Sequence, residues 1–195
     1  MDGAIRHHFY CMRGLPKAVH GLRLVTGAEV NIKDFDGGLD LDRDVLRQLD
    51  FVVASYHVEA IDPAASEQHT RGWLNVIANP DVDCLGHCGN PVFACDYEAV
   101  VKACREHGKA VEINSSSFKV RPGSAETCRA VALLCKEYGV TVLISSDAHS
   151  RYFVGDHRAA IRLLESVGFP EELVINGEKG RLMNYLDWLE QGKAL

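Results

Sequence analysis

Five residues that could bind a divalent metal ion each follow a short apolar run of the chain. They are Glu29, His57, His87, Asp147 and His149. Carboxylate oxygens and neutral imidazole nitrogens are ligands of zinc and manganese, and iron accepts the same set. Because the apolar runs have the length of buried strands, a metal-competent side chain is expected at the end of several successive strands. This pattern predicts a metal site of the kind that a metal-dependent hydrolase uses.

Taken singly, most of these residues have an ordinary structural explanation. Glu29 could be a solvated side chain at a sheet edge, and His57 could be a hydrogen-bonded core histidine. His87 is more informative, because the glycines and the proline next to it predict a tight turn that presents the imidazole to a cleft. Asp147 and His149 stand two residues apart after one strand, so both reach the same place. The five together favour metal binding over five unrelated roles.

The elements that must position these residues alternate between strand and helix. Strands are expected at residues 22–30, 51–57, 84–87, 110–114 and 141–146, with a weaker one at 173–176. Helices are expected at 42–49, 67–78, 97–107, 125–138, 156–167 and 181–191. Such alternation is typical of a parallel α/β sheet or barrel, in which the site lies at the carboxyl ends of the strands. Since no linker or repeat interrupts residues 1–195, we expect one domain.

The expected helix ends also have recognisable signals. Gly108 and Gly139 stand where two helices should stop, in the position that favours glycine. Asp96 and Ser124 are candidates to cap the helices that follow them.

Composition argues against several classes of function. A formal charge of -6 gives no sign of the basic face that a nucleic-acid-binding protein needs. No apolar stretch approaches the roughly 20 residues that cross a bilayer, so a membrane partner is not expected. The seven cysteines are irregularly spaced, which favours a reduced, cytoplasmic protein. Cys84 and Cys88 flank His87, but a structural zinc site would need a second such pair.

Two further segments carry polar side chains beyond the strand at 110–114. Asn114 and the serines after it are either turn formers or part of a site. Lys119 and Arg121 precede the expected start of a helix, and a cation beside a helix N-terminus suits a phosphate. A solvated loop would explain these two cations equally well.

The motifs together resemble those of the PHP (polymerase and histidinol phosphatase) family, in particular its bacterial metal-dependent phosphatases. The matching segments are Gly27-Ala28-Glu29-Val30-Asn31-Ile32-Lys33, Ser55-Tyr56-His57, Gly86-His87-Cys88-Gly89-Asn90-Pro91, Glu112-Ile113-Asn114-Ser115-Ser116 and Ser145-Ser146-Asp147-Ala148-His149. The resemblance covers nearly the whole chain. It implies a distorted seven-stranded β/α barrel that carries up to three metal ions and hydrolyses phosphate esters, here those of a small phosphorylated substrate.

The N-terminal part of the chain departs from the family pattern. Family members begin with a strand that ends in His-x-His, a further histidine and a second strand that ends in Asp-His. Nothing before Glu29 supplies these residues, and His7 and His8 are adjacent rather than alternating. The expected fold is therefore a PHP-type (β/α)7 barrel that lacks its first two strand units. An incomplete N-terminus and a natural remnant would both account for the difference.

The resemblance also implies a role for each ligand. Glu29, His57 and His87 would form one complete metal site. Glu29 would bridge to a second metal that also uses Asp147, and His149 would remain from a third site. Arg121 would neutralise phosphoryl oxygens, and His149 would protonate the leaving group when it holds no metal.

The missing ligands and strands lead to one expectation for activity and one for assembly. Phosphatase activity should be weak or absent if the second and third metals are under-ligated. Unpaired strand edges should be covered by the apolar residues among the first twenty, or by a second copy of the chain in a homo-oligomer. Two other functions stay open: a non-catalytic metal- or ligand-binding remnant, and a metal-dependent amidohydrolase that would act on C–N bonds with the same ligand types.

Overall fold

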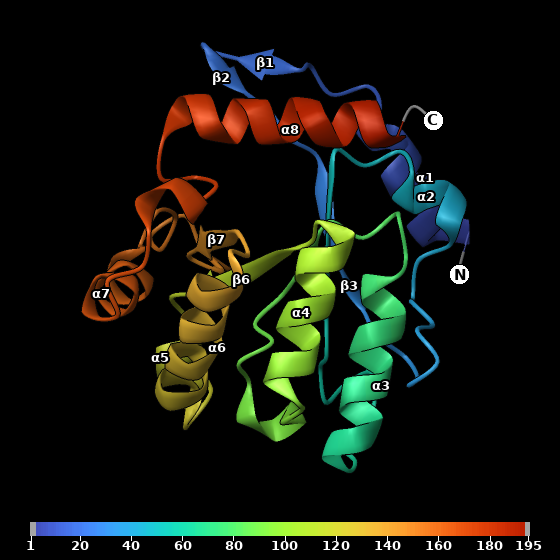
Figure 1. The fold of residues 1–195 in the computed structure, drawn as a ribbon. Coiled ribbons are helices and arrows are strands. Elements are labelled where there is room, and N and C mark those ends of the chain that lie inside the picture. Colours follow the sequence, from blue (N-terminus) through green and yellow to red (C-terminus); the bar gives the residue numbers. More distant parts are fainter. Residues whose placement is uncertain (1–2, 194–195) are drawn as a thin grey trace.

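A five-stranded parallel sheet forms the centre of the protein, as seen in a computed structural model that describes residues 3–193 (Figure 1). Its strands are β3 (Gly27–Asn31), β4 (Phe51–Ser55), β5 (Cys84–Leu85), β6 (Ala110–Asn114) and β7 (Val142–Ser145). Each strand pairs with its neighbour in the chain, so the order in the sheet is the order in the sequence. The expected α/β class and parallel sheet are confirmed.

The helices that follow these strands in the chain cover one face of the sheet. They are α2 (Arg43–Leu46), α3 (Ser66–Ile77), α4 (Tyr97–His107), α5 (Ser117–Val120), α6 (Ser124–Tyr138) and α7 (Arg158–Ser166), with 3-10 turns at Pro91–Phe93 and Glu171–Leu173. In Figure 1, α3, α4 and α6 lie side by side over this face. The strand side chains that face them are buried: Val30, Val52, Ala54, Leu85, Val111 and Ile113. This layer is the main hydrophobic core.

The opposite face of the sheet has an apolar half and a polar half. Successive strand residues point to opposite faces, so Phe51 and Val53 lie on this side. They pack with Leu182 and Tyr185 of α8 (Lys179–Lys193), which crosses the sheet near the amino ends of its strands (Figure 1). Further along the strands this face carries Glu29, Asn31, Ser55, Glu112 and Asn114. The polar half is where a site can form.

The sheet is not closed into a barrel within the described residues. Strands β3 and β7 are its two edges, and the expected PHP-type (β/α)7 barrel is not confirmed. The weak strand predicted at 173–176 is wrong: Glu171–Leu173 is a 3-10 turn, and only Val174 bridges to Val142. A proline and two glutamates at 170–172 favour the turn over an extended strand.

The strand predicted at 22–30 is divided into two pieces. β1 (Ala18–Val19) and β2 (Leu22–Arg23) form a short antiparallel hairpin, whose turn holds His20 and Gly21 at positive φ. β3 then starts at Gly27. The mainly apolar run extends over both β2 and the first part of β3, so its hydrophobicity gave no sign of the break between these two strands.

The N-terminal helix α1 (Gly3–Met12) packs beside α2. Its Phe9 and Met12 contact the main core, and Arg6 bonds to the carboxylates of Asp42 and Asp44. Part of the apolar N-terminal segment is thus used in packing, whereas Leu15 and others remain exposed. No helix among residues 3–193 is long and apolar enough to cross a membrane.

The helix ends test the expected caps. Gly108 and Gly139 end α4 and α6 in the left-handed conformation, which confirms both. Asp96 caps α4 by accepting a hydrogen bond from the backbone N–H of Ala99. The expected cap at Ser124 is wrong, because Gly123 occupies the cap position of α6.

Removing the α4 cap is expected to destabilise the protein. Replacing Asp96 with alanine leaves the N–H of Ala99 without this acceptor, which should lower the free energy of unfolding by about 1 kcal/mol. Asp96→Asn keeps a side-chain oxygen in place and should stay close to the native value. Urea denaturation followed by circular dichroism measures both, and equal losses in the two variants would show that the cap contributes little.

Candidate metal centre

Glu29, His57 and His87 converge at the carboxyl side of β3, β4 and β5. The Oε1 atom of Glu29 is 3.0 Å from Nε2 of His87 and 3.4 Å from Nε2 of His57, and the two Nε2 atoms are 3.0 Å apart. This is the one cluster of at least three potential ligands that residues 3–193 bring together. The structure therefore places these three expected ligands at one point.

The backbone at the end of β5 brings the two histidines together. Any Cβ at Gly86 would lie 2.0 Å from Oγ of Ser55 and 2.8 Å from Cγ1 of Val53, so only glycine fits between these neighbours. His87 then takes a positive φ of 29°, and its N–H donates to Oε2 of Glu112 over 2.7 Å. This turn directs the His87 ring, which is only 3% exposed, toward Glu29.

Neighbouring side chains fix the orientation of the three ligands. Ser55 donates a hydrogen bond to Oε1 of Glu29 over 2.6 Å. Nδ1 of His57 donates to Oδ1 of Asn31 over 2.8 Å, which leaves the lone pair of Nε2 directed into the cluster. The backbone N–H of Asn31 is in turn bound by Asp40. Metal-binding histidines commonly have such an outer partner on the second ring nitrogen.

The charges of the cluster favour a cation. Partial burial alone would raise the pKa of Glu29, but hydrogen bonds from His57 and His87 outweigh it and hold that pKa well below its usual range. The hydrogen bond to Glu29 raises the pKa of His57. Burial raises the pKa of Glu112, which lies beside the cluster. The carboxylate of Glu29 thus faces two imidazoles in a partly desolvated place, and Glu112 is bonded to the backbone N–H of His87 beside them.

The spacing of the three ligand atoms fits one metal ion. Bonds of about 2.0–2.2 Å in tetrahedral geometry put the ligand atoms about 3.3–3.6 Å from one another. The observed separations of 3.0, 3.0 and 3.4 Å are within a few tenths of an ångström of that range. One carboxylate and two imidazoles are also a donor set that zinc, manganese and iron accept. These residues fit the expected metal.

Asp147 and His149 do not join this cluster in the structure. Asp147 follows β7 at a positive φ of 49°, and its Oδ2 accepts a hydrogen bond from Asn114 over 3.1 Å. His149 is exposed and bonds through Nδ1 to the carbonyl oxygen of Asp147 (3.0 Å). Arg121 lies 3.7 Å from Asp147, so the expected phosphate-binding arginine contacts an expected ligand.

Asn114 connects Asp147 to the cluster. Its Nδ2 contacts both Asp147 and, at 3.5 Å, Oε2 of Glu112, the carboxylate that holds the turn at His87. Its Oδ1 accepts from the N–H groups of Ser116 and Ser117 and so also shapes the turn after β6. Asn114 therefore shapes the turn and contacts Asp147, while its role in a site stays a prediction.

Sequence reasoning missed several residues that support the site. Ser55, Asn31 and Glu112 were not singled out as site residues, although all three contact the ligands. A signal existed for Glu112, because a carboxylate between Val111 and Ile113 in a buried strand is unusual. The cysteines, by contrast, form no metal cluster among the described residues, and Cys84 and Cys88 are buried free thiols.

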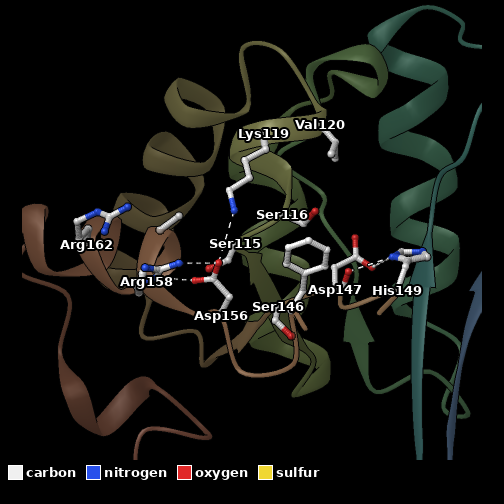
Figure 2. Close-up of a pocket in the computed structure, with 12 residues that line it drawn as sticks. Ser115, Ser116, Lys119, Val120, Ser146, Asp147, His149, Asp156, Arg158 and Arg162 are labelled. Atoms are coloured by element: carbon white, nitrogen blue, oxygen red, sulfur yellow. Dashed lines mark hydrogen bonds and ion pairs between the residues drawn. The ribbon is translucent and has the colours of Figure 1, made fainter. Parts of the chain in front are cut away.

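A cavity of about 490 Å³ adjoins Asp147 and His149. Figure 2 shows its lining, which comes from the loop after β6, from α5, from the loop after β7 and from the start of α7. Lys119 lines it, whereas Arg121 lies beside it on Asp147. Of the two cations that the sequence placed together, only Lys119 therefore lines this cavity.

Comparison with known proteins gives close relatives. A protein of Acetivibrio thermocellus named "Probable phosphatase" is 43% identical over 180 residues, which are 92% of this chain and 75% of that protein. Proteins of the same name from Caldicellulosiruptor saccharolyticus and Clostridium botulinum (strain Langeland) are each 41% identical, over 93% and 92% of this chain and 75% and 74% of theirs. No established family profile matches the chain.

Among solved structures, a chain in the cryo-EM structure of archaeal ribonuclease P with mature tRNA has a similar fold. The TM-score is 0.54 at 16% identity, and the match covers 98% of this chain and 78% of the other. The likeness at this identity concerns the fold alone.

Fold and site define an α/β protein with a Glu-His-His cluster that could hold a metal ion at the carboxyl edge of its sheet. The chain belongs to the family of the bacterial proteins named "Probable phosphatase" described above.

Proposed function

We propose that the protein is a metal-dependent phosphoesterase of the PHP type, with zinc or manganese, or else iron, held by Glu29, His57 and His87. The convergence of these three ligand atoms from three successive strands carries the proposal. The name of the relatives supports action on phosphate, and the order of the sequence motifs supports the PHP type. A small phosphorylated molecule is the proposed substrate.

A divalent metal in this cluster would lower the pKa of a bound water and attract phosphoryl oxygens. Side chains next to the cluster hold the proposed metal ligands in position. Ser55 and Asn31 hold Glu29 and His57 in position, and Glu112 fixes the turn that carries His87. Preorganised ligands of this kind bind without having to reorient.

Arg121 and His149 are proposed to act on the substrate directly. Arg121 is anchored by Ser117 at 3.0 Å and lies 3.7 Å from Asp147, so its guanidinium is near the proposed metal ligands and can neutralise phosphoryl oxygens. His149 is exposed at the mouth of the cavity and can give a proton to the leaving oxygen. Asp147 is the proposed ligand of a second metal.

Metal titration and a phosphatase assay test the proposal together. The chain is stripped with a chelator and titrated calorimetrically with Zn²⁺ or Mn²⁺, and the loaded protein is assayed with 4-nitrophenyl phosphate. We expect one metal to bind at the cluster and hydrolysis that depends on it. Turnover should be weak, because residues 3–193 bring together a single three-ligand cluster. Metal binding without hydrolysis of phosphate esters would favour the non-catalytic alternative, and cleavage of amides instead would favour an amidohydrolase.

Metal affinity should depend on pH through His57. The pKa of this imidazole is raised by Glu29, so a proton competes with the metal for Nε2 to a higher pH than in free histidine. Apparent affinity should therefore fall as pH falls through that pKa, by up to about tenfold per pH unit for one competing proton. Calorimetry between about pH 5 and pH 8 measures this. A flat profile would show that His57 is not a ligand.

The raised pKa of His57 makes the stability of the metal-free protein depend on pH in the opposite direction to metal affinity. Because the pKa of His57 is raised on folding, its contribution to stability is complete below the pKa of the unfolded chain and is lost as pH rises through the folded value. Metal-free protein should thus lose stability from this group toward alkaline pH, while the metal-bound form gains affinity.

A further inference from the structure

The cavity beside Asp147 gathers positively charged side chains. Lys119 comes from α5, and Arg158 and Arg162 come from α7. In Figure 2, Lys119 and Arg158 point toward Asp156, and Arg162 lies next to them on the same side. We call these three residues the cation group. Three positively charged side chains in one cavity are unexpected in a chain with a formal charge of -6.

Asp156 holds two of the three side chains of the cation group in place and leaves some of their hydrogen-bond donors unpaired. It accepts hydrogen bonds from Nε and Nη2 of Arg158 at 2.8 and 3.1 Å, and Nζ of Lys119 is 3.5 Å away. A guanidinium has five N–H donors and an ammonium three, so donors remain on both. The guanidinium of Arg162, within α7, has no hydrogen-bond or ion-pair partner among residues 3–193. Three cations against the two carboxylates of the lining, Asp156 and Asp147, still leave a net positive charge here.

The N-terminal end of α7 adds partial positive charge to the same cavity. This helix begins at Arg158, and its first residues line the cavity. The N–H of Ala160 is held by Oγ of Ser115 at 3.0 Å, which ties the helix start to the turn after β6. The unpaired N–H groups of a first helical turn carry partial positive charge and attract anions.

The cation group shares a cavity with the proposed proton donor and with the proposed ligand of a second metal. Asp147 and His149 form part of the same lining. A volume of about 490 Å³ is within the range of about 300–1,000 Å³ that small-molecule sites have. A molecule that places one phosphate at the metal cluster could extend past His149, the proposed proton donor to the leaving group, into this space.

We propose that the cation group binds a second anionic group, a phosphate or a carboxylate, on the alcohol part of the phosphate ester. The preferred substrate is then a phosphate ester with two anionic groups, and the proposal rests on the phosphoesterase function above. Lys119, Arg158 and Arg162 recognise the group that is not cleaved. They set specificity, while Glu29, His57 and His87 hold the metal.

Binding to metal-free protein tests the cation group by itself. The probe is fructose 1,6-bisphosphate, titrated calorimetrically at low ionic strength into the native chain and into Arg162→Gln and Lys119→Gln. Each variant should bind about fivefold more weakly, as is usual for loss of an exposed charged pair. Arg105→Gln removes a charge from the exposed end of α4, outside the cavity, and should bind like the native chain. Equal affinity in all four proteins would overturn the proposal.

Hydrolysis by the metal-loaded protein tests the second anionic group. Three six-carbon probes differ at the far end: sorbitol 6-phosphate has no second anion, 6-phosphogluconate has a carboxylate, and fructose 1,6-bisphosphate has a phosphate. We expect kcat/KM to be about tenfold higher for one of the last two, through a lower KM, and this ratio to fall in Arg162→Gln. The probe that gains identifies the group.

The outcomes separate this proposal from the proposed function. Metal-dependent hydrolysis of 4-nitrophenyl phosphate with equal kcat/KM for the three sugar probes would leave the phosphoesterase function standing and overturn the role of the cation group. Binding of the bisphosphate that depends on Arg162, in a chain that neither binds metal nor hydrolyses any ester, would show an anion site and overturn the function.

Discussion

Replacing His87 with alanine should lower the affinity for Zn²⁺ or Mn²⁺ by roughly a thousandfold or more, because one of three ligands is lost and two rarely hold a metal. Among residues 3–193 the cluster holds no fourth potential ligand, so no neighbouring side chain replaces His87. Metal-dependent hydrolysis should disappear with it. Competition against a chromophoric chelator gives the affinity directly.

The control for this variant is another histidine outside the cluster. His107 is exposed in the last turn of α4, and His107→Ala should keep native metal affinity. Thermal unfolding shows whether the His87 variant is still folded. A folded His87→Ala protein with native affinity would place the metal elsewhere and overturn the assignment of the cluster.

Replacing Gly86 with alanine should damage both the fold and the site. The new methyl group would lie 2.0 Å from Oγ of Ser55 and 3.4 Å from Oε1 of Glu29, so Ser55 must move and release its hydrogen bond to Glu29. Overpacking of a filled core costs about 1–3 kcal/mol. Loss of an outer partner of a metal ligand lowers metal affinity by about 10–100-fold.

Two further variants check this explanation. Gly180→Ala adds the same methyl group in α8, where the nearest neighbour is the flexible side chain of Glu178 at 3.7 Å, and should leave stability and metal affinity near native. The double variant Gly86→Ala with Ser55→Ala removes the closest clash and should recover part of the stability. If Gly86→Ala alone were as stable as the native chain, the close approach at β5 would not constrain the site.

The sequence predicted the cluster because its ligands stand at strand ends, which parallel pairing brings to one edge. Glu29, His57 and His87 follow from that rule alone. The rule does not predict how a loop beyond the strand folds. Asp147 takes a positive φ two residues after the end of β7, and His149 beyond this turn is exposed rather than in the cluster. A local backbone conformation, invisible in the apolar pattern, decided where these two residues lie.

The extent of the sheet was harder to predict than its class. Strand–helix alternation indicated α/β, and β6 was predicted with its observed bounds, Ala110–Asn114. The run at 22–30 is mainly apolar although it contains β2, a loop and most of β3, so its hydrophobicity did not indicate the division. The cation group was missed because Lys119 and Arg158 are 39 residues apart in sequence and are joined only through Asp156.

The order of the strands has a consequence for how the protein assembles. Each strand adds beside the one made just before it, and the three clustered ligands all lie within residues 29–87. The three ligands can therefore meet while β7 is still being synthesised, once Glu112 of β6 is in place to hold the turn at His87. An ion that binds early would hold β3, β4 and β5 in register and offer the rest of the chain a template on which to fold. Metal supply during translation would then affect how much folded protein accumulates.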